Sequence, residues 1–296
     1  MMHPDEIAVP VELVARLIAS QHPQFAGLPL RRVQSTGTVN AIFRLGDEYC
    51  VRLPRLSWAG QALRNEWDVL SVVAPHVTLA VPEVVAIGAP DEGYPLPWAI
   101  YRWIPGRPWD GSPVDERENT RTLAKFVTQL HAIPVVGHPP TAGRQPLADL
   151  DQMTIDAIRA CGNDVDVDAA LRVWRDAVEG EPWDGNPVWI HSDLLKPNLI
   201  IDGGKLTAVI DFGSAGVGDP AFDVIPAWAV LTSETRDWFR DLLKVDEPTW
   251  RRARAYALHQ AALIIPYYRH SNPVFAEQAK QTIANLLGVE EVGAQP

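Results

Sequence analysis

Two neighbouring stretches decide the fold of this 296-residue chain: WIHSDLLKPN at residues 189–198 and VIDFG at residues 209–213. The first contains the pattern H-x-D-x4-N, and the second ends in D-F-G. Two short strands are predicted after the first pattern, at 199–201 and 206–210, joined by the turn sequence DGGK. A loop with this pattern, followed by a hairpin that ends in D-F-G, is typical of phosphoryl-transfer sites.

The residue types in these stretches fit the chemistry of that reaction. Transfer of a γ-phosphoryl group requires an acceptor hydroxyl held in line and a carboxylate beside it that takes its proton, a role that suits Asp193. The triphosphate requires Mg²⁺, which prefers oxygen ligands. Asn198 supplies an amide oxygen and Asp211 a carboxylate, and the short hairpin between them brings the two together.

The combination is rare by chance. At about 5% usage per residue type, H-x-D-x4-N alone occurs in roughly 0.04 of chains of this length. Requiring D-F-G within about 20 further residues lowers that figure to about 10⁻⁴. The alternative, that these are ordinary capping and loop residues, is therefore weak.

The chain resembles the aminoglycoside phosphotransferase family of small-molecule kinases, which has a protein-kinase-like fold. The residues that carry the resemblance are His191-Ser192-Asp193 through Asn198, Ile210-Asp211-Phe212-Gly213, Gly218-Asp219-Pro220 and Asp223. The resemblance extends over most of the chain, but its specificity lies mainly in residues 189–226.

The resemblance implies roles for the residues of these motifs. Asp193 is implied to be the catalytic base, and Asn198 and Asp211 the magnesium ligands. We expect His191 to brace the catalytic loop through hydrogen bonds rather than to act in acid–base chemistry. Asp223 is expected to be a structural acceptor that fixes backbone N–H groups of the same loop.

The first hundred residues should then hold the nucleotide. The segment STGTVN at 35–40, with Gly37 and Thr38, lies where kinases place a phosphate-covering loop, but it lacks G-x-G-x-x-G and by itself fits a plain turn almost as well. The third predicted strand carries Arg52 where kinases have a phosphate-pairing lysine, and a guanidinium can bind phosphate oxygens with two N–H groups. Glu66, on the following predicted helix, is the expected ion-pair partner. Either charge also fits an ordinary surface position.

The connection between the lobes is predicted at residues 99–106, AIYRWIPG. Kinases recognise the purine edge with backbone groups at this place, so the Arg102 carbonyl and the Ile104 N–H are the expected contacts. Tyr101 falls at the gatekeeper position. Members of the resembled family with a bulky residue there can prefer GTP, so ATP and GTP are both candidate donors.

The rest of the sequence divides into two lobes at PGRP, residues 105–108, which interrupts regular structure. Before it, one helix is predicted at 58–74 and short strands at 31–35, 40–45, 49–53, 84–87 and 97–104. After it, helices are predicted at 116–132, 149–160, 166–179, 221–231, 235–243, 249–268 and 273–287. Asp219-Pro220 is expected to open the helix at 221–231.

The predicted fold is therefore α+β and bilobal, like that of the protein kinases. Residues 1–104 are expected to form a small β-rich, nucleotide-binding lobe that includes the connection. Residues 105–296 are expected to form a larger, mainly helical lobe that carries the catalytic residues and binds the acceptor.

Composition excludes several other classes. With 47% hydrophobic and 21% charged residues, the chain is globular rather than disordered. A net charge of −11 argues against nucleic acid and anionic membranes as partners. No apolar stretch is long enough for a transmembrane helix, no signal peptide is visible, and two cysteines cannot form a disulfide scaffold. We expect a cytoplasmic protein, either a monomer or a homodimer.

The charge distribution bears on the acceptor. Residues 1–104 carry a net −2 and residues 105–296 carry −9. This imbalance favours a cationic small molecule. The acidic residues that suggest it lie on helices after D-F-G: Glu234, Asp237, Asp241 and Glu277.

The leading hypothesis is a kinase that phosphorylates an aminoglycoside and so confers antibiotic resistance. The alternatives are a kinase of another small acceptor, such as a macrolide, an amino sugar or a metabolite, and a non-catalytic nucleotide-binding protein. The joint presence of Asp193, Asn198 and Asp211 argues against the last. The short tract between Gly213 and Gly218 and the missing A-P-E segment argue against a protein substrate.

Overall fold

The computed structural model describes residues 6–33, 39–110, 114–137, 139–142 and 144–288. Its helices are α1 (Val11–Gln21), α2 (Ala59–Val73), α3 (Glu116–His131), α4 (Leu147–Cys161), α5 (Val167–Val178), α6 (Pro226–Ala229), α7 (Ser233–Leu243), α8 (Glu247–Tyr268) and α9 (Pro273–Leu287). Its strands are β1 (Leu30–Arg32), β2 (Asn40–Leu45), β3 (Tyr49–Pro54), β4 (Val84–Gly88), β5 (Trp98–Arg102), β6 (Arg107–Pro108), β7 (Val188–Ile190), β8 (Leu199–Asp202), β9 (Lys205–Val209) and β10 (Gly216–Gly218).

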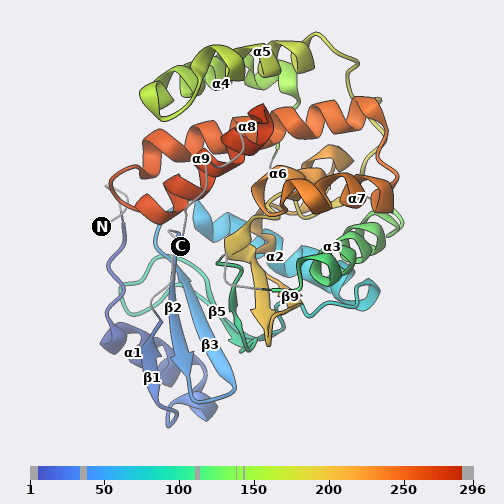
Figure 1. The fold of residues 1–296 in the computed structure, drawn as a ribbon. Coiled ribbons are helices and arrows are strands. Elements are labelled where there is room, and N and C mark those ends of the chain that lie inside the picture. Colours follow the sequence, from blue (N-terminus) through green and yellow to red (C-terminus); the bar gives the residue numbers. More distant parts are fainter. Residues whose placement is uncertain (1–5, 34–38, 111–113, 138, 143, 289–296) are drawn as a thin grey trace.

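The strands of the N-terminal part and the helices of the C-terminal part occupy opposite ends of the molecule. In Figure 1, β1, β2, β3 and β5 lie at the bottom with α1, while α4, α5, α8 and α9 lie at the top. Helix α2 and strand β9 lie between these two ends. The predicted α+β class, with a β-rich N-terminal region and a mainly helical C-terminal region, is confirmed.

The N-terminal part is one antiparallel sheet of strand order β1-β2-β3-β5-β4. Alternate residues of β2 are buried, namely Ala41, Phe43 and Leu45, as a strand with one covered face requires. Helix α1 covers that face with its apolar residues, among them Leu17 and Ile18. This helix is absent from the sequence prediction.

The opposite face of the sheet lies against α2. In the pairing of β3 with β5, Arg52 lies opposite Ala99 and Cys50 lies opposite Tyr101. Residues opposite each other in antiparallel strands project from the same face. Arg52 and Tyr101 therefore both face α2, where Ala99, Tyr101 and Leu63 of α2 form a small buried cluster.

Two small sheets hold the motif loops in place. Strand β7 leads directly into His191 and pairs with β10, which follows D-F-G. Strands β8 and β9 form the predicted hairpin, and β6 adds to its edge, with Arg107 opposite Ile201. Gly106 just before β6 has φ +110°, and a Cβ there would lie 2.7 Å from the Ile201 carbonyl oxygen, so the tight connection between the two parts requires glycine.

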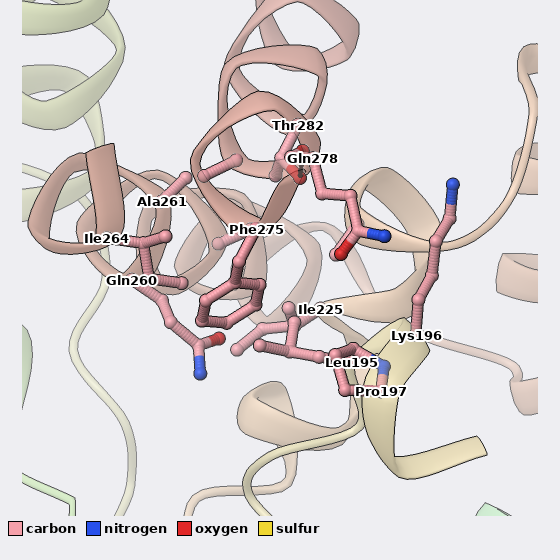
Figure 2. A pocket seen from close by; sticks show the side chains of 13 residues that line it. Leu195, Lys196, Pro197, Ile225, Gln260, Ala261, Ile264, Phe275, Gln278 and Thr282 are labelled. Atoms are coloured by element: carbon pink, nitrogen blue, oxygen red, sulfur yellow. Dashed lines mark hydrogen bonds between the residues drawn. The ribbon is translucent and has the colours of Figure 1, made fainter. Parts of the chain in front are cut away.

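The helices after the motif pack into the larger core. Asp115, Asp166 and Asp246 cap α3, α5 and α8 by accepting hydrogen bonds from backbone N–H groups. Helices α8 and α9 pack together beside residues 195–197, and a narrow, mostly apolar hollow separates them from that segment, with Phe275 over it (Figure 2).

The helix predicted at 221–231 is wrong. The chain instead forms a 3₁₀ turn, η6 (Pro220–Val224), and then the single-turn helix α6. The cause is Pro226, which has no N–H to continue a helix but fits the first turn of a new one. Asp219 caps η6 by accepting from the Ala221 N–H at 3.0 Å.

Within the described ranges, no helix is both long and apolar enough to cross a bilayer. Cys50 and Cys161 are both free thiols.

Candidate active site

The loop after β7 holds Asp193 at the junction of the two parts. Ser192 adopts a left-handed backbone conformation with φ +66°, which is unusual for a residue with a Cβ. Its backbone N–H donates to Asp223 Oδ1 at 2.8 Å, and its hydroxyl donates to the Ser214 carbonyl at 2.9 Å. The loop is thus held in a strained conformation by contacts on both sides, as is common at functional sites.

The Asp193 carboxylate accepts three side-chain hydrogen bonds. Asn198 Nδ2 donates to Oδ2 at 2.8 Å, and Gln260 Nε2 and Arg144 Nη2 donate to Oδ1 at 2.6 and 3.2 Å. One quarter of the side chain stays exposed, at 25%. Asp193 is therefore oriented by its neighbours and still open to a ligand.

His191 and Asp223 lie beneath the loop and are completely buried. The His191 ring lies with Nε2 3.0 Å from the Ile210 carbonyl and with Nδ1 3.2 Å from the Asp193 N–H. A neutral ring protonated at Nε2 satisfies both contacts. Asp223 accepts from the backbone N–H groups of His191 and Ser192 and contacts His131 Nε2 at 3.1 Å. Both residues hold backbone groups of the catalytic loop.

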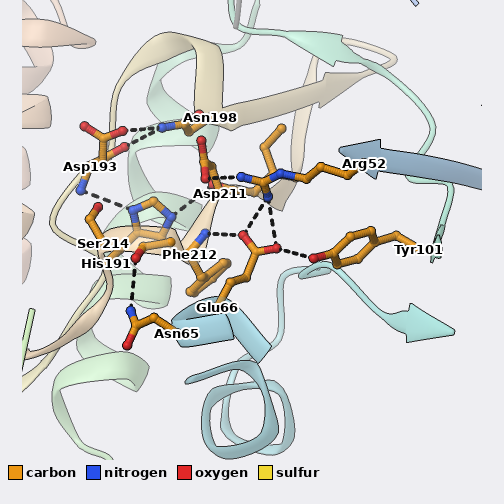
Figure 3. Close-up of polar contacts among 12 residues, drawn as sticks. Arg52, Asn65, Glu66, Tyr101, His191, Asp193, Asn198, Asp211, Phe212 and Ser214 are labelled. Carbon is orange, nitrogen blue, oxygen red and sulfur yellow. Dashed lines mark hydrogen bonds and ion pairs between the residues drawn. The ribbon is translucent and has the colours of Figure 1, made fainter. Parts of the chain in front are cut away.

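The Asp211 carboxylate, which follows the β8–β9 hairpin, contacts the guanidinium of Arg52 on strand β3 (Figure 3). Arg52 Nη2 donates to Asp211 Oδ1 at 2.7 Å, and Asp211 itself has φ +67°. Burial acts to raise the pKa of Asp211, but the charge and hydrogen bond of the Arg52 guanidinium outweigh burial and hold the pKa below its ordinary value. The Asp211 side chain is 43% exposed.

Glu66 fixes the other side of the same guanidinium. Arg52 Nη1 donates to Glu66 Oε1 at 2.9 Å and to Oε2 at 2.7 Å. The buried Glu66 carboxylate also accepts from the Tyr101 hydroxyl at 2.7 Å and from the Phe212 N–H at 2.9 Å. Helix α2, strand β3, strand β5 and the D-F-G segment therefore meet at one carboxylate.

Asn40 completes the surroundings of Arg52. With its amide oxygen turned toward the guanidinium, it accepts from Arg52 Nη2 at 2.9 Å and from Nε at 3.1 Å. Glu66 and Asp211 raise the pKa of Arg52 although burial opposes them, so the guanidinium is always charged. Asn40 ends the segment 35–40 that the sequence suggested as a phosphate loop; Gly37 and Thr38 lie outside the described residues.

The donor set fits a magnesium ion. The Asn198 amide nitrogen is committed to Asp193, which leaves the amide oxygen as its free ligand atom. Asp211 adds a partly exposed carboxylate. No cluster of three His, Cys, Asp or Glu side chains that could hold a metal occurs in the described part of the chain. Two protein oxygens, completed by phosphate oxygens and water, are the usual way proteins hold Mg²⁺ beside a nucleotide.

Three residues that the sequence predicts to contact the nucleotide, Tyr101, Arg102 and Ile104, lie in or just after β5. The Arg102 side chain lies at the surface, where Nε donates to Glu83 at 3.1 Å. Ile104 follows the end of β5 and is half-buried. The Tyr101 hydroxyl is directed inward to Glu66. Of these three predicted residues, only Tyr101 places its side chain in the Arg52–Glu66–Asp211 cluster.

A hollow of about 270 Å³ opens beside Asp193. Arg144 and Gln260, which both hydrogen-bond to Asp193, form part of its wall. The remaining described residues that line it are Gln145, Leu150, Met153, Phe222, Ile225, Tyr256 and His259. Glu234, Asp237, Asp241 and Glu277, which suggested a cationic acceptor, are exposed on α7 and α9 and are not among them.

Arg144, Gln260 and Asn65 are site residues that the sequence prediction missed. Arg144 and Gln260 lie 49 and 67 residues from Asp193 and belong to no motif. Asn65 donates to the carbonyls of Gly213 and Ala215 at 3.0 and 2.9 Å. Its position directly before Glu66 is the only signal in the sequence that could have found it.

Comparison with known proteins places this site in a family. A family model described as "Phosphotransferase enzyme family" matches residues 32–256. The chain is 28% identical over 199 residues to the uncharacterized protein YcbJ of Bacillus subtilis (strain 168), covering 61% of this chain and 62% of that protein. It is also 28% identical to an Escherichia coli aminoglycoside 3'-phosphotransferase over 158 residues, 49% of this chain and 55% of that enzyme. The matches thus span less than two thirds of these relatives.

Solved structures show the same fold over nearly the whole chain. The GDP complex of wild-type aminoglycoside 2'-phosphotransferase-IIIa superposes with a TM-score of 0.73 at 17% identity, covering 95% of this chain and 99% of that one. Macrolide 2'-phosphotransferase type I superposes with a TM-score of 0.64 at 18% identity, covering 94% and 98%. The predicted kinase-like fold is confirmed.

Proposed function

The chain belongs to the phosphotransferase enzyme family, and we propose that it transfers the γ-phosphoryl group of ATP or GTP to a hydroxyl group of a small molecule. The observation that carries the proposal is the meeting of Asp193, Asn198 and Asp211 with Arg52 at the junction of the two parts. The names of relatives support it, since enzymes that act on aminoglycosides and macrolides share the fold.

Asp193 acts as the base in this proposal. Its carboxylate takes the proton of the acceptor hydroxyl while the hydroxyl oxygen forms a bond to the γ-phosphorus and the bond to the leaving nucleoside diphosphate breaks. Asn198, Gln260 and Arg144 hold the carboxylate in one orientation, and Gln260 and Arg144 also line the hollow that would contain the acceptor. Positioning is the main contribution a protein makes to this reaction.

The nucleotide side is proposed to involve Arg52, Glu66 and the segment 101–104. Glu66 and Asn40 hold the Arg52 guanidinium so that it can bind phosphate oxygens. Backbone groups of Arg102 and Ile104 are proposed to contact the purine. Asn198 and Asp211 would hold Mg²⁺, which when bound neutralises charge on the phosphates.

The chemical identity of the acceptor is to be determined by experiment. Aminoglycosides are the first compounds to test, because several relatives are named for them. ATP and GTP are both tested as donors, because nucleotide complexes of structural neighbours contain GDP, ADP or ATP.

The test is mass spectrometry for phosphate addition to a panel of aminoglycosides, macrolides and amino sugars with each donor. We expect Asp193→Asn to lower the transfer rate by roughly 10²–10⁴-fold, because the base is lost, while nucleotide affinity changes little. Asp202→Asn, an exposed residue at the end of β8, is the matched control and should keep full activity. Full turnover by Asp193→Asn would exclude Asp193 as the base.

A further inference from the structure

The hollow beside Asp193 offers an acceptor apolar walls and no negative charge of its own. Its apolar wall consists of residues from α4, η6 and α8 and Ile225: Leu150, Met153, Phe222, Ile225 and Tyr256. Among the described residues that line it, none is a carboxylate and Arg144 is the charged one. The narrow hollow on the other side of Gln260 has the same character, since its described lining contains Lys196 but no carboxylate (Figure 2).

His259 adds a neutral polar group to this wall. Its Nδ1 lies 2.7 Å from Thr154 Oγ1, and that hydroxyl donates to the Leu150 carbonyl at 2.8 Å. Because Thr154 has one hydroxyl hydrogen, His259 Nδ1 must be the donor, and Nε2 is left as an acceptor. Burial and, less strongly, Arg144 lower the pKa of His259 to about 4. The ring is therefore uncharged at neutral pH.

Arg144 lines the hollow, and its guanidinium has N–H donors that are not used within the described part of the protein. Nε and Nη2 donate to the Ser192 carbonyl at 3.1 and 2.9 Å, and Nη2 also contacts Asp193. Nη1 has no hydrogen-bond partner within the described ranges, and 29% of the side chain is exposed. A guanidinium fixed in this way binds carboxylate or phosphate oxygens well, because its planar N–H donors are already oriented.

Gln260 has an unused acceptor beside the same base. Its Nε2 donates to Asp193, but Oε1 is buried without a hydrogen-bond partner among the described residues. A buried polar atom of this kind is costly unless a ligand or water satisfies it. Gln260 borders both hollows, so a hydroxyl donor in either one could reach its side chain.

We infer that the acceptor is a hydroxyl compound with an apolar body and a negatively charged group near that hydroxyl, and that Arg144 selects it. The inference rests on the proposed function, because Asp193 defines where the acceptor hydroxyl lies. A polyamine meets the Arg144 charge in this hollow. The carboxylates near the hollow are already engaged: Asp193 by Arg144, Gln260 and Asn198, and Asp219, which contacts the lining residue Tyr256, by Arg252. The acidic surface of α7 lies outside the lining.

Three probes with one skeleton separate charge from shape. Each has a hydroxyl on the middle carbon of a phenylpropyl body: 3-phenyllactate is anionic, its methyl ester is neutral, and 1-amino-3-phenylpropan-2-ol is cationic. Dissociation constants are measured by ligand-observed NMR, and phosphate addition with ATP or GTP by mass spectrometry. We expect 3-phenyllactate to bind at least 10-fold more tightly than the amino alcohol, with the ester between them.

Variants then identify the selecting residue. Arg144→Gln should weaken 3-phenyllactate binding at least 10-fold and leave the ester within about 2-fold, while Arg144→Lys, which keeps the charge, should retain part of the preference. Arg159→Gln on the exposed face of α4 is the matched control and should change nothing. Melting temperatures of all variants exclude loss of folding as the cause.

The outcomes for the inference and for the proposed function differ. Any one of three results would overturn the inference: equal binding of the three probes, an Arg144→Gln effect that is the same for all three, or a lower KM for kanamycin than for 3-phenyllactate. Phosphate transfer to kanamycin would still leave the proposed function intact. Arg144-dependent binding of 3-phenyllactate without phosphate transfer to any hydroxyl would support the inference about the pocket and refute the proposed function.

Discussion

Arg52 contacts Glu66, the ion-pair partner that the sequence predicted, and two residues that it did not predict, Asp211 and Asn40. The guanidinium bridges Glu66 and Asp211 and also meets the Asn40 amide. Asp211 is the carboxylate proposed to bind Mg²⁺, and its Oδ1 already accepts a hydrogen bond from Arg52 Nη2. Binding of a magnesium nucleotide must therefore redistribute these contacts, with the phosphates taking over part of the Arg52 guanidinium.

Glu66→Gln should show how far the site depends on this cluster. The substitution leaves the largely buried Arg52 charge with less compensation and places an amide beside donors, so the free energy of unfolding should fall by about 2 kcal/mol or more. The nucleotide KM should rise because Arg52 loses its orientation. Thermal melts and donor kinetics measure the two effects. Glu83→Gln, whose ion pair with Arg102 is exposed, should change stability by no more than about 0.5 kcal/mol; equal effects of the two variants would refute a special role for Glu66.

His259 should give the stability of the protein a defined pH dependence. The unfolded chain protonates His259 below about pH 6.5, whereas the folded protein resists protonation until about pH 4. The unfolded state therefore binds more protons in that window, and wild type should lose up to about 1.4 kcal/mol per pH unit there through this residue. His259→Gln should lack that component.

Denaturant titrations of wild type and His259→Gln between pH 7 and 4.5 measure the difference. The exposed Gln61, which does not titrate, serves as the control position, and Gln61→Ala should follow the wild-type curve. Parallel curves for wild type and His259→Gln would mean that the ring is protonated equally in both states.

Individual site residues differ in how well the sequence predicts them. Asp193, Asn198 and Asp211 stand at fixed spacings in motifs, because one loop and one hairpin must bring their oxygens together. Arg144 comes to Asp193 from the segment before α4 and Gln260 from α8, so only tertiary packing brings them together. For that reason, the residues that line the acceptor pocket could not be predicted from the sequence.

Helix α2 connects the sheet to the D-F-G segment through two adjacent residues. Glu66 accepts the Phe212 N–H, and Asn65 donates to the carbonyls of Gly213 and Ala215. These bonds run from the helix to the backbone of η5 (Phe212–Ser214) and the residue after it. They fix the segment directly after Asp211.

Asn65→Ala should therefore weaken magnesium-nucleotide binding without touching a ligand. Two carbonyls lose their donor, which should lower the free energy of unfolding by about 1–3 kcal/mol, and Asp211 loses part of its support. Titration of nucleotide with Mg²⁺ measures the affinity. Gln61→Ala removes an exposed amide from the same helix and should leave affinity and stability unchanged. An Asn65→Ala protein with wild-type affinity would show that Glu66 alone holds the segment.

The sequence predicted most long helices well, and it missed the short strands that depend on packing and one helix, α1. Helix α9 begins and ends where predicted, and α2 and α3 differ by a residue at their ends. The three-residue strands β7 and β10 exist only because they pair with each other. Helix α1 was missed although Leu13, Val14, Leu17 and Ile18 have helical spacing, so its signal was present in the sequence.

The Arg52–Glu66–Asp211 cluster connects the N-terminal sheet, helix α2 and the C-terminal helical part of the molecule. Arg52 comes from the sheet, Glu66 from α2 and Asp211 from the hairpin of the helical part. The proposed nucleotide would lie against residues of both parts at this place. Its binding should therefore stabilise the entire fold rather than one part of it.

A nucleotide should raise the melting temperature in a way that depends on the metal. At a nucleotide concentration about 100 times its dissociation constant, mass action stabilises the folded state by about 2.7 kcal/mol, which corresponds to about 5 °C or more for a chain of this size. Removing Mg²⁺ with EDTA should abolish most of the increase, because the phosphates then face Asp211 without a cation between them. Asp211→Asn should show a small increase that EDTA does not change, whereas the control Asp202→Asn should behave like wild type. If EDTA leaves the increase intact in wild type, the phosphates are held by Arg52 and the backbone, and Asp211 is not a metal ligand.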